Sequence, residues 1–548
     1  MCHLPAEPSP PEDSHDRERM TANETSVGAP APDLTHRQIL VIFSGLMLGM
    51  FLAALDQTIV ATALPTITGE LGGLNHLSWV VTAYLLASTV STPLYGKLGD
   101  LYGRRRLFQI AIVIFLVGSI LSGLARNMAQ LIIFRAIQGV GGGGLLVLAQ
   151  AIIADVVPPR QRGRYQGFFG AVFGASSVAG PLLGGFFTDQ LSWRWVFYIN
   201  IPLGIVALFV TSVVLPAGLR RGNPRVDYAG VGVLTAAVSC IVLFTTWGGT
   251  EYAWASPMIL GLIAAAVLLL AALWAIERRA PEPVVPAHLF SVRTFNVATS
   301  VSFIVGVAMF GAISFLPLFV QVVNGASATN SGLLLLPLMV GLLLASVGSG
   351  QAITRTGRYK VFPVIGTALA ALTMFLLSTM GTSTSPATVT AFMVLLGTGL
   401  GFTMQTLVLA TQNSVPARDL GAATSSVSFF RSMGGSIGVA LFGALFNSGL
   451  GNRLDRLSLA VGDTRALSPE AIRLLPAESS HAVASAFAAS LTSVFLLAVP
   501  LVVLAFGLTW FLREAPLQSS VRPVAHDREL AAGSGPGTAE PEAISDLH

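Results

Sequence analysis

Charged residues are scarce in this chain of 548 residues, where they make up 11% of the sequence against 53% for hydrophobic residues. A soluble protein carries about a quarter of its residues as charges, because polar groups must cover its surface. The shortage excludes an ordinary soluble enzyme or binding module. It indicates a polytopic membrane protein whose main surroundings are the lipid bilayer.

Groups that bind metals or perform covalent catalysis are also missing. The chain has two cysteines, Cys2 in a polar segment and Cys240 in an apolar run, and no Cys-x-x-Cys or His-Glu-x-x-His motif. Two cysteines so placed predict no disulfide framework and no metal site. The histidines lie outside the long apolar runs, which argues against a Ser-His-Asp hydrolase, and no basic patch is interleaved with aromatic residues. We therefore expect no enzymatic activity, no cofactor and no nucleic-acid partner.

A phosphate-binding loop is absent as well. Gly141 to Gly144 form a glycine run, but no strand pattern precedes it and no Lys-Ser/Thr pair closes it. Close packing of helices through small residues explains the run better. Because no nucleotide motif is present, the energy source we expect is an ion gradient and not ATP.

Long apolar runs are what the chain does contain. A helix crosses the hydrocarbon layer with about 20 apolar residues, and the sequence holds fourteen runs of about that length. They lie near residues 38–63, 78–95, 107–125, 131–154, 164–187, 198–216, 228–247, 257–276, 297–321, 330–352, 361–380, 387–411, 422–447 and 488–512. The flanking segments 1–37 and 513–548 are polar, and we expect both to be disordered tails. The first of them lacks the apolar core of a signal peptide.

Lysine and arginine follow an alternating pattern along the chain. Every second short loop carries the cations, and the loops between them hold only Arg126 and Arg194. The long segment 448–487 also contains arginines, but acidic residues offset them. Because cytoplasmic loops carry an excess of cations, the alternation supports fourteen spans with both termini in the cytoplasm.

Three short patterns recur at a nearly constant distance. The link Gly96–Arg104 recurs as Gly350–Arg358, with Thr354 in the place of Asp100; Pro158–Gly163 recurs as Pro416–Gly421, and Gly139–Gly141 as Gly397–Gly399. The first six and last six runs therefore form a parallel repeat, with two runs inserted between them. We expect a six-helix bundle over 38–216, an insertion over 217–296 and a second bundle over 297–512.

Five motifs together carry a family resemblance. They are Leu55–Pro65, Gly96–Arg106, Arg135–Gly139, Gly170–Gly185 and Arg431–Gly438. On these motifs the chain resembles the fourteen-span drug:proton antiporters of the major facilitator superfamily, the QacA- and EmrB-like proteins, over about residues 38–512. The resemblance implies an all-α fold of two six-helix bundles plus two inserted central helices. It also implies a monomer in a bacterial cytoplasmic membrane that exports a small amphipathic molecule in exchange for protons, by alternating access.

Asp56 is the acid that lies well inside a predicted span. An ionisable group at that depth is costly and marks a functional site by default. Arg135 lies at a similar distance from the same membrane face, about 6 Å against about 10 Å at 1.5 Å per residue, and is the expected partner. We expect proton binding at Asp56 to compete with pairing to Arg135. The alternatives are a structural carboxylate at Asp56 and an Arg135 side chain that reaches the membrane interface.

The basic link after the second span is the expected gate. Its key residues are Gly96, Asp100, Gly103 and Arg104. Asp100 stands near a helix end, where a carboxylate can accept from Arg104 or cap a neighbouring helix. The resemblance implies that this motif locks the two bundles together in the outward-facing state. The alternative is a signal of topology alone.

The fifth span carries the pattern that, by resemblance, marks exporters over importers. Its residues are Gly170, Gly174, Gly180, Pro181 and Gly184. Small residues bring helices close together, proline favours a kink, and in an exporter we expect this face to seal the interface between the bundles.

Four further polar residues are candidates to line the transport route. These are Gln138, Gln321, Gln405 and Arg431. The alternative for the glutamines is a bond to a neighbouring helix, and Arg431 is a buried cation for which the sequence names no partner. With one deep acid, the favoured substrate is a neutral or monocationic drug or natural product. The alternative function is a secondary importer of a nutrient or metabolite.

Overall fold

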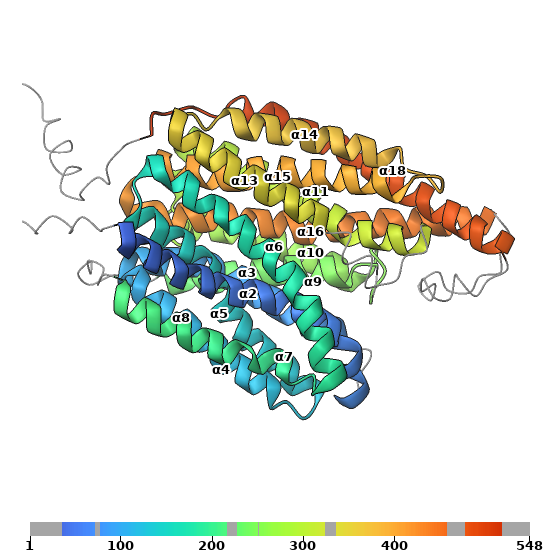
Figure 1. The fold of residues 1–548 in the computed structure, drawn as a ribbon, viewed down its shortest axis with the longest axis horizontal. Helices are drawn as coiled ribbons and strands as arrows, with labels where there is room; N and C mark the ends of the chain where they lie inside the picture. The colour runs from blue at the N-terminus through green and yellow to red at the C-terminus, as the bar shows by residue number, and fades with distance from the viewer. Residues whose placement is uncertain are drawn as a thin grey trace, which may run out of the picture. The chain divides into compact units, whose positions relative to one another are not determined.

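The computed structural model describes residues 36–71, 77–215, 227–249, 251–323, 336–456 and 477–517. These residues belong to one compact unit, His36–Val521. The expected tails, 1–37 and 513–548, fall almost entirely outside the described residues, so their predicted disorder stays a prediction. The regular elements of the described part are helices, as expected (Figure 1).

The helices are named by the predicted division into two bundles and an insertion. The first bundle contains α2 (His36–Leu71), α3 (Leu77–Tyr102), α4 (Arg104–Gly123), α5 (Met128–Val156), α6 (Pro159–Gln190), the short α7 (Trp195–Tyr198) and α8 (Asn200–Val214). The insertion contains α9 (Tyr228–Trp247), α10 (Pro257–Glu277) and the 3-10 turn η2 (Ala287–Ser291).

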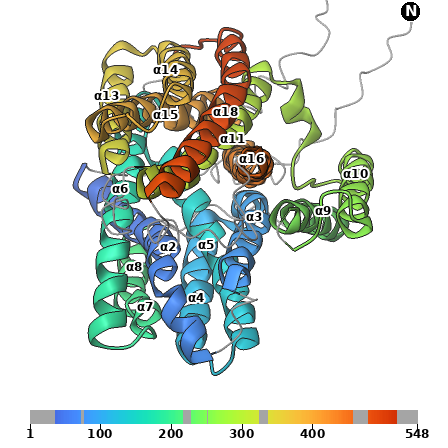
Figure 2. The ribbon, with the colours of Figure 1, turned by 90° about the vertical axis from the view of Figure 1, so that its right-hand side faces the viewer.

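The second bundle follows the insertion along the chain. It contains α11 (Arg293–Val323), α13 (Leu336–Thr356), α14 (Val361–Ser378), α15 (Pro386–Ser414), the turn η3 (Ala417–Asp419), α16 (Leu420–Arg456) and α18 (Ala477–Thr509). The last two helices extend well past the expected limits of 447 and 488. Down the helix axes, the two bundles lie side by side, with α9 next to α3 and α16 and α10 packed against α9 (Figure 2).

Thirteen described segments are long and apolar enough to cross a membrane. The expected second span, α3, is not among them, although it is a helix of 26 residues. This helix is rich in serine and threonine, and it packs against α5, α16 and α9. The count of fourteen spans stays a prediction that rests on α3.

Equivalent positions in the two bundles start and end helices in the same way. The Asn127 side chain accepts from the N–H of Gln130 and begins α5, and the Ser385 side chain accepts from the N–H of Thr388 and begins α15. Gly103 and Gly357 directly follow the last residues of α3 and α13, with φ of 94° and 73°. Glycine is favoured there because side chains disfavour a positive φ. These matched positions support the predicted repeat.

The glycine run of α5 is a packing feature, as predicted. A Cβ at Gly141 would lie 2.5 Å from the backbone nitrogen of Phe115 in α4, and one at Gly143 would overlap the carbonyl of Ser88 in α3. The bare glycine backbone thus lets α5 sit between α3 and α4 at van der Waals distance.

The insertion is fastened to both bundles. Leu234, Val238 and Val242 of α9 form a buried cluster with Met433 of α16, and Leu86 and Val90 of α3 pack against it. Beyond α10, Glu282 forms an ion pair with Lys97 of α3 at 2.5 Å. The inserted helices therefore contact the link region of the first bundle as well as the second bundle.

Candidate transport site and gate

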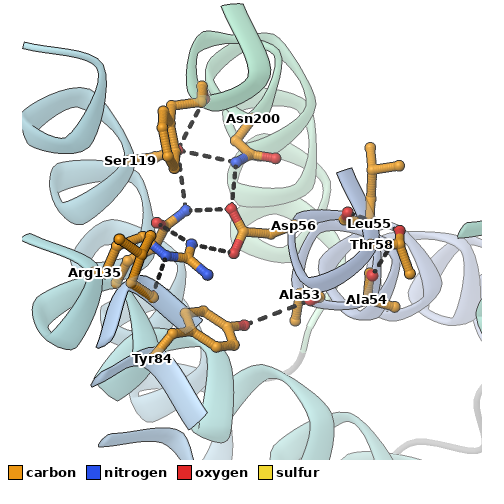
Figure 3. A network of polar contacts seen from close by, with 12 residues as sticks. Ala53, Ala54, Leu55, Asp56, Thr58, Tyr84, Ser119, Arg135 and Asn200 are labelled. Carbon is orange, nitrogen blue, oxygen red and sulfur yellow. Dashed lines mark hydrogen bonds and ion pairs between the residues drawn. The ribbon is translucent and has the colours of Figure 1, made fainter. Parts of the chain in front are cut away.

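Asp56 lies in the middle of α2 with no exposed surface, and both its oxygens are occupied (Figure 3). Nη1 of Arg135 in α5 forms an ion pair with Oδ2 at 2.5 Å. Nε2 of Gln138, one turn further along α5, donates to Oδ1 at 2.7 Å, and Nδ2 of Asn200 in α8 donates to the same oxygen at 3.3 Å. The two side chains expected to be partners thus meet in a buried, hydrogen-bonded ion pair.

The guanidinium of Arg135 is held from several sides. Its Nη1 also donates to Oε1 of Gln138 at 2.7 Å, and its Nε donates to the carbonyl of Val80 at 3.4 Å. The ring of Tyr84 lies 4.3 Å from the guanidinium carbon, within the range of a cation–π contact. With 2% of its surface exposed, Arg135 is turned inward to Asp56 and not toward the membrane interface.

Two residues that the sequence analysis missed complete the network. Oγ of Ser119 in α4 accepts from Gln138 at 3.1 Å and from Asn200 at 2.9 Å, and donates to the carbonyl of Phe197 at 2.8 Å. Asn200 was discoverable, because it is an amide inside an otherwise apolar run. The network joins α2, α4, α5 and α8. The side-chain oxygen Oδ1 of Asn200 is buried and accepts no hydrogen bond from the described residues.

This arrangement can couple a proton to a change of structure. A proton on Asp56 would remove the negative charge that balances Arg135, in a place where an unpaired charge is costly. Arg135 would then need another partner, and a rearranged bundle is one way to supply it.

The basic link contacts the other bundle through Asp100. We call the end of the helices that carries Arg104 and Arg160 the basic end. There, the two carboxylate oxygens of Asp100 accept from the N–H groups of Gly421 and Ala422, at 3.0 and 2.9 Å. These groups belong to the first turn of α16, whose N–H groups have no helical partners. Asp100 therefore caps a helix of the opposite bundle.

Arg104 holds Asp100 in place. Its Nη2 pairs with Oδ1 of Asp100 at 2.6 Å, and its Nη1 pairs with Asp155 and donates to the carbonyl of Ala151 at 2.8 Å. Asp155, which lies in the last turn of α5, was not among the residues predicted from the sequence. Gly96 and Gly103 serve the geometry of the link: a Cβ at Gly96 would lie 2.6 Å from the carbonyl of Gly421.

The second link contacts the first bundle in a different way. The hydroxyl of Thr354, at the position of Asp100, bonds within its own helix to the carbonyl of Gly350 at 2.8 Å. It is Arg160 of α6 that reaches across, donating to the carbonyls of Thr354 and Arg355 at 3.2 and 3.4 Å. The first link therefore contacts the opposite bundle through the acidic cap of Asp100. At the second link, the exposed Arg160 makes the contact between the bundles instead.

The glycines of α6 divide into two groups. A Cβ at Gly170 would lie 2.7 Å from Leu342 of α13, and one at Gly174 would lie 3.6 Å from Met339. Gly180 and Gly184 instead lie against Thr58 and Thr62 of α2. Pro181 stands between Gly180 and Gly184, inside the helix. The five residues were expected to form one face between the bundles. Gly170 and Gly174 do lie between the bundles, whereas Gly180 and Gly184 pack within the first bundle.

Substitution Gly184→Ala is expected to lower the stability of the protein. The new methyl would overlap Thr62 and lie 2.9 Å from the carbonyl of Ile59, and overpacking of this kind costs about 1–3 kcal/mol. The control is Gly185→Ala, where nothing lies within 4 Å of the new methyl. Thermal unfolding in detergent should show a lower midpoint for the first variant alone; equal midpoints would contradict the close contact of α2 and α6.

The remaining candidates lie in different places. Gln405 is buried in α15, with no partner for Oε1 among the described residues, and Gln321 lies near the end of α11 and has an interaction partner. A separate amide bridge joins the bundles, where Nε2 of Gln166 donates to Oε1 of Gln412 at 2.9 Å. Arg431 lies in α16, and its Nη1 is buried without a hydrogen-bond partner in the described part of the chain. Within the described ranges, Gln405 and Arg431 form no hydrogen bond or ion pair with the Asp56 network.

Comparison with known proteins gives the family. A sequence model of the Major Facilitator Superfamily matches residues 46–439. An uncharacterised MFS-type transporter of Mycobacterium tuberculosis is 46% identical, over 96% of this chain and 76% of its own length. The multidrug transporter MdtP of Bacillus subtilis is 38% identical, over 90% of this chain and 96% of its own. The fold is similar to that of the proton:xylose symporter XylE, with a TM-score of 0.56 at 16% identity, over 85% of this chain and 95% of the other.

The family model and both relatives indicate one class of protein, a membrane carrier and not an enzyme. The chain belongs to the Major Facilitator Superfamily. It is a multi-pass membrane protein whose relatives carry small molecules.

Proposed function

We propose that the protein exports small amphipathic molecules, drugs or natural products, in exchange for protons. The observation that carries the proposal is the buried ion pair of Asp56 and Arg135, enclosed by Gln138 and Asn200. The name of MdtP, a multidrug transporter at 38% identity, supports the substrate class.

The exchange follows from competition at Asp56. When Asp56 is ionised, Arg135 is balanced and the first bundle keeps the arrangement described above. When a proton binds, Arg135 loses its counter-charge, and the equilibrium shifts toward a second arrangement of the bundles. A ligand can shift such an equilibrium only as far as its affinities for the two states differ, and the proton meets this condition because it acts directly on the ion pair.

The gate in this proposal is the cap of Asp100 on α16. In this proposal the basic end faces the cytoplasm of a bacterial cell, since cytoplasmic loops carry an excess of cations, and both termini are on the same side. Closed contacts at this end, from Asp100 to Gly421 and from Arg160 to Thr354, support an outward-facing state. Substrate from the cytoplasm or inner leaflet would enter only after both contacts break.

The direction of flux tests export against its alternative, import of a nutrient. In inverted membrane vesicles with an acidic interior, a fluorescent amphipathic dye is expected to accumulate inside. An ionophore that dissipates the proton gradient should release the dye. Loss of dye from preloaded inverted vesicles under the same gradient would support the importer instead.

A further inference from the structure

Arg431 is a cation deep in the second bundle. It lies eleven residues after Leu420, the first residue of α16, which corresponds to about 16 Å along the helix axis. Its Nη1 is buried and has no hydrogen-bond partner within the described ranges. A guanidinium without a partner in a membrane-spanning helix is costly, and such residues mark substrate or ion pathways.

Arg431 belongs to a helix that packs against several others. The helix packs against α3, α9, α11 and α18, with further contacts to α5 and α15. Its backbone is fixed against α11, because Gly306 leaves no room for a side chain beside the carbonyl of Arg431. Met433, two residues on, belongs to the cluster that α16 forms with α9. The residue Arg431 as a whole keeps intermediate exposure, while Nη1 of its guanidinium is fully buried.

The charges within the described spans do not balance. Away from the span ends, the charged side chains are Asp56, Arg135 and Arg431. The first two neutralise each other, and hydrogen bonds already occupy both oxygens of Asp56. Arg431 is therefore left as a positive charge without a counter-charge in the described interior.

We propose that Arg431 is the counter-charge for an anionic group, such as a carboxylate or sulfonate, on the transported molecule. The inference rests on the proposed transport function and narrows its substrate class. A guanidinium suits this role because its planar fork of donors binds a carboxylate in two-point fashion. Counting acids alone favoured neutral or monocationic substrates, whereas the paired state of Asp56 and the unpaired state of Arg431 favour amphipathic acids and zwitterions.

A matched pair of dyes tests the proposal. Rhodamine B carries a free carboxylate, and its ethyl ester has the same ring system without that charge. Fluorescence anisotropy with the purified, detergent-solubilised protein should give an affinity for the acid about tenfold or more above that for the ester. In Arg431→Gln the affinity for the acid should fall about tenfold, the loss of one charge-assisted contact, with the ester unchanged. Arg431→Lys, which keeps the charge, should retain part of the preference.

Ester binding also reports whether the variant is folded. Equal affinities of the wild-type protein for the two dyes would overturn the proposal. It would also be overturned if Arg431→Gln lost affinity for the acid and the ester to the same extent while Arg431→Lys bound both normally. Flux in inverted vesicles separates this test from that of export. If dye binding depends on Arg431 but no dye is transported, export is refuted and the anion site still stands. If both dyes are transported equally well with and without Arg431, the anion site is refuted and export still stands.

Discussion

Replacement of Asp56 by Asn is expected to abolish transport driven by a proton gradient. Asn keeps the size of the side chain but cannot exchange a proton, and it leaves Arg135 buried without a counter-charge. Removing one partner of a buried ion pair costs about 3–5 kcal/mol, so the unfolding midpoint should also fall. Dye accumulation in inverted vesicles measures the first effect and thermal unfolding in detergent measures the second. Accumulation that still follows the proton gradient in this variant would rule out Asp56 as the coupling group.

A double variant separates coupling from stability. Asp56→Asn combined with Arg135→Gln removes both charges and should regain most of the lost stability, while transport stays absent. A double-mutant cycle measures the interaction of the pair as the difference between the effect of the double variant and the sum of the two single effects. If the losses of the two single variants simply add, the ion pair contributes nothing to the fold and the competition mechanism fails.

Loss of the carboxylate at Asp100 is expected to open the basic end. Asp100→Ala removes the cap from α16, and loss of a cap costs about 1–2 kcal/mol. Since 1.4 kcal/mol is a factor of ten in an equilibrium constant, the population with this end open should rise about tenfold. Ser425 of α16 is buried against Gly96 of α3, where the two bundles meet. A cysteine in its place, in a protein without Cys2 and Cys240, reports the opening through its rate of maleimide labelling.

Two controls belong to this measurement. A cysteine in place of Ser122, buried within the first bundle, should label at the same slow rate in both backgrounds. Thr354→Val, at the position equivalent to Asp100, should leave labelling at 425 unchanged, because that hydroxyl bonds only within its own helix. Faster labelling in Thr354→Val than in Asp100→Ala would reverse the proposed roles of the two links.

The pairing of Asp56 with Arg135 could be predicted because depth in a membrane follows from counting residues along a helix. Their shared depth made them candidates for contact before any packing was known. Ser119 could not be predicted in the same way, since serine is common in membrane helices and only packing decides which serine meets Gln138.

The gate shows a different limit. That Asp100 accepts hydrogen bonds near a helix end follows from the link itself. Its partner, the first turn of α16, lies 321 residues further along the chain, and only the packing of the two bundles brings it there. The second span, predicted near 78–95, is a helix of 26 residues in the structure, yet it is not among the thirteen candidate spans, so the count of fourteen stays a prediction.

The inserted helices determine how the bundles can move. Because α9 lies against α3 and α16 at once, any rocking of the second bundle must slide α16 along α9 or pull α9 away from α3. The ion pair of Lys97 and Glu282 fastens the far end of the insertion to the first bundle and favours sliding. The helices then slide along the contact surface of Leu234, Val238 and Met433. The flexible methionine side chain suits a contact that must break and form again in every transport cycle.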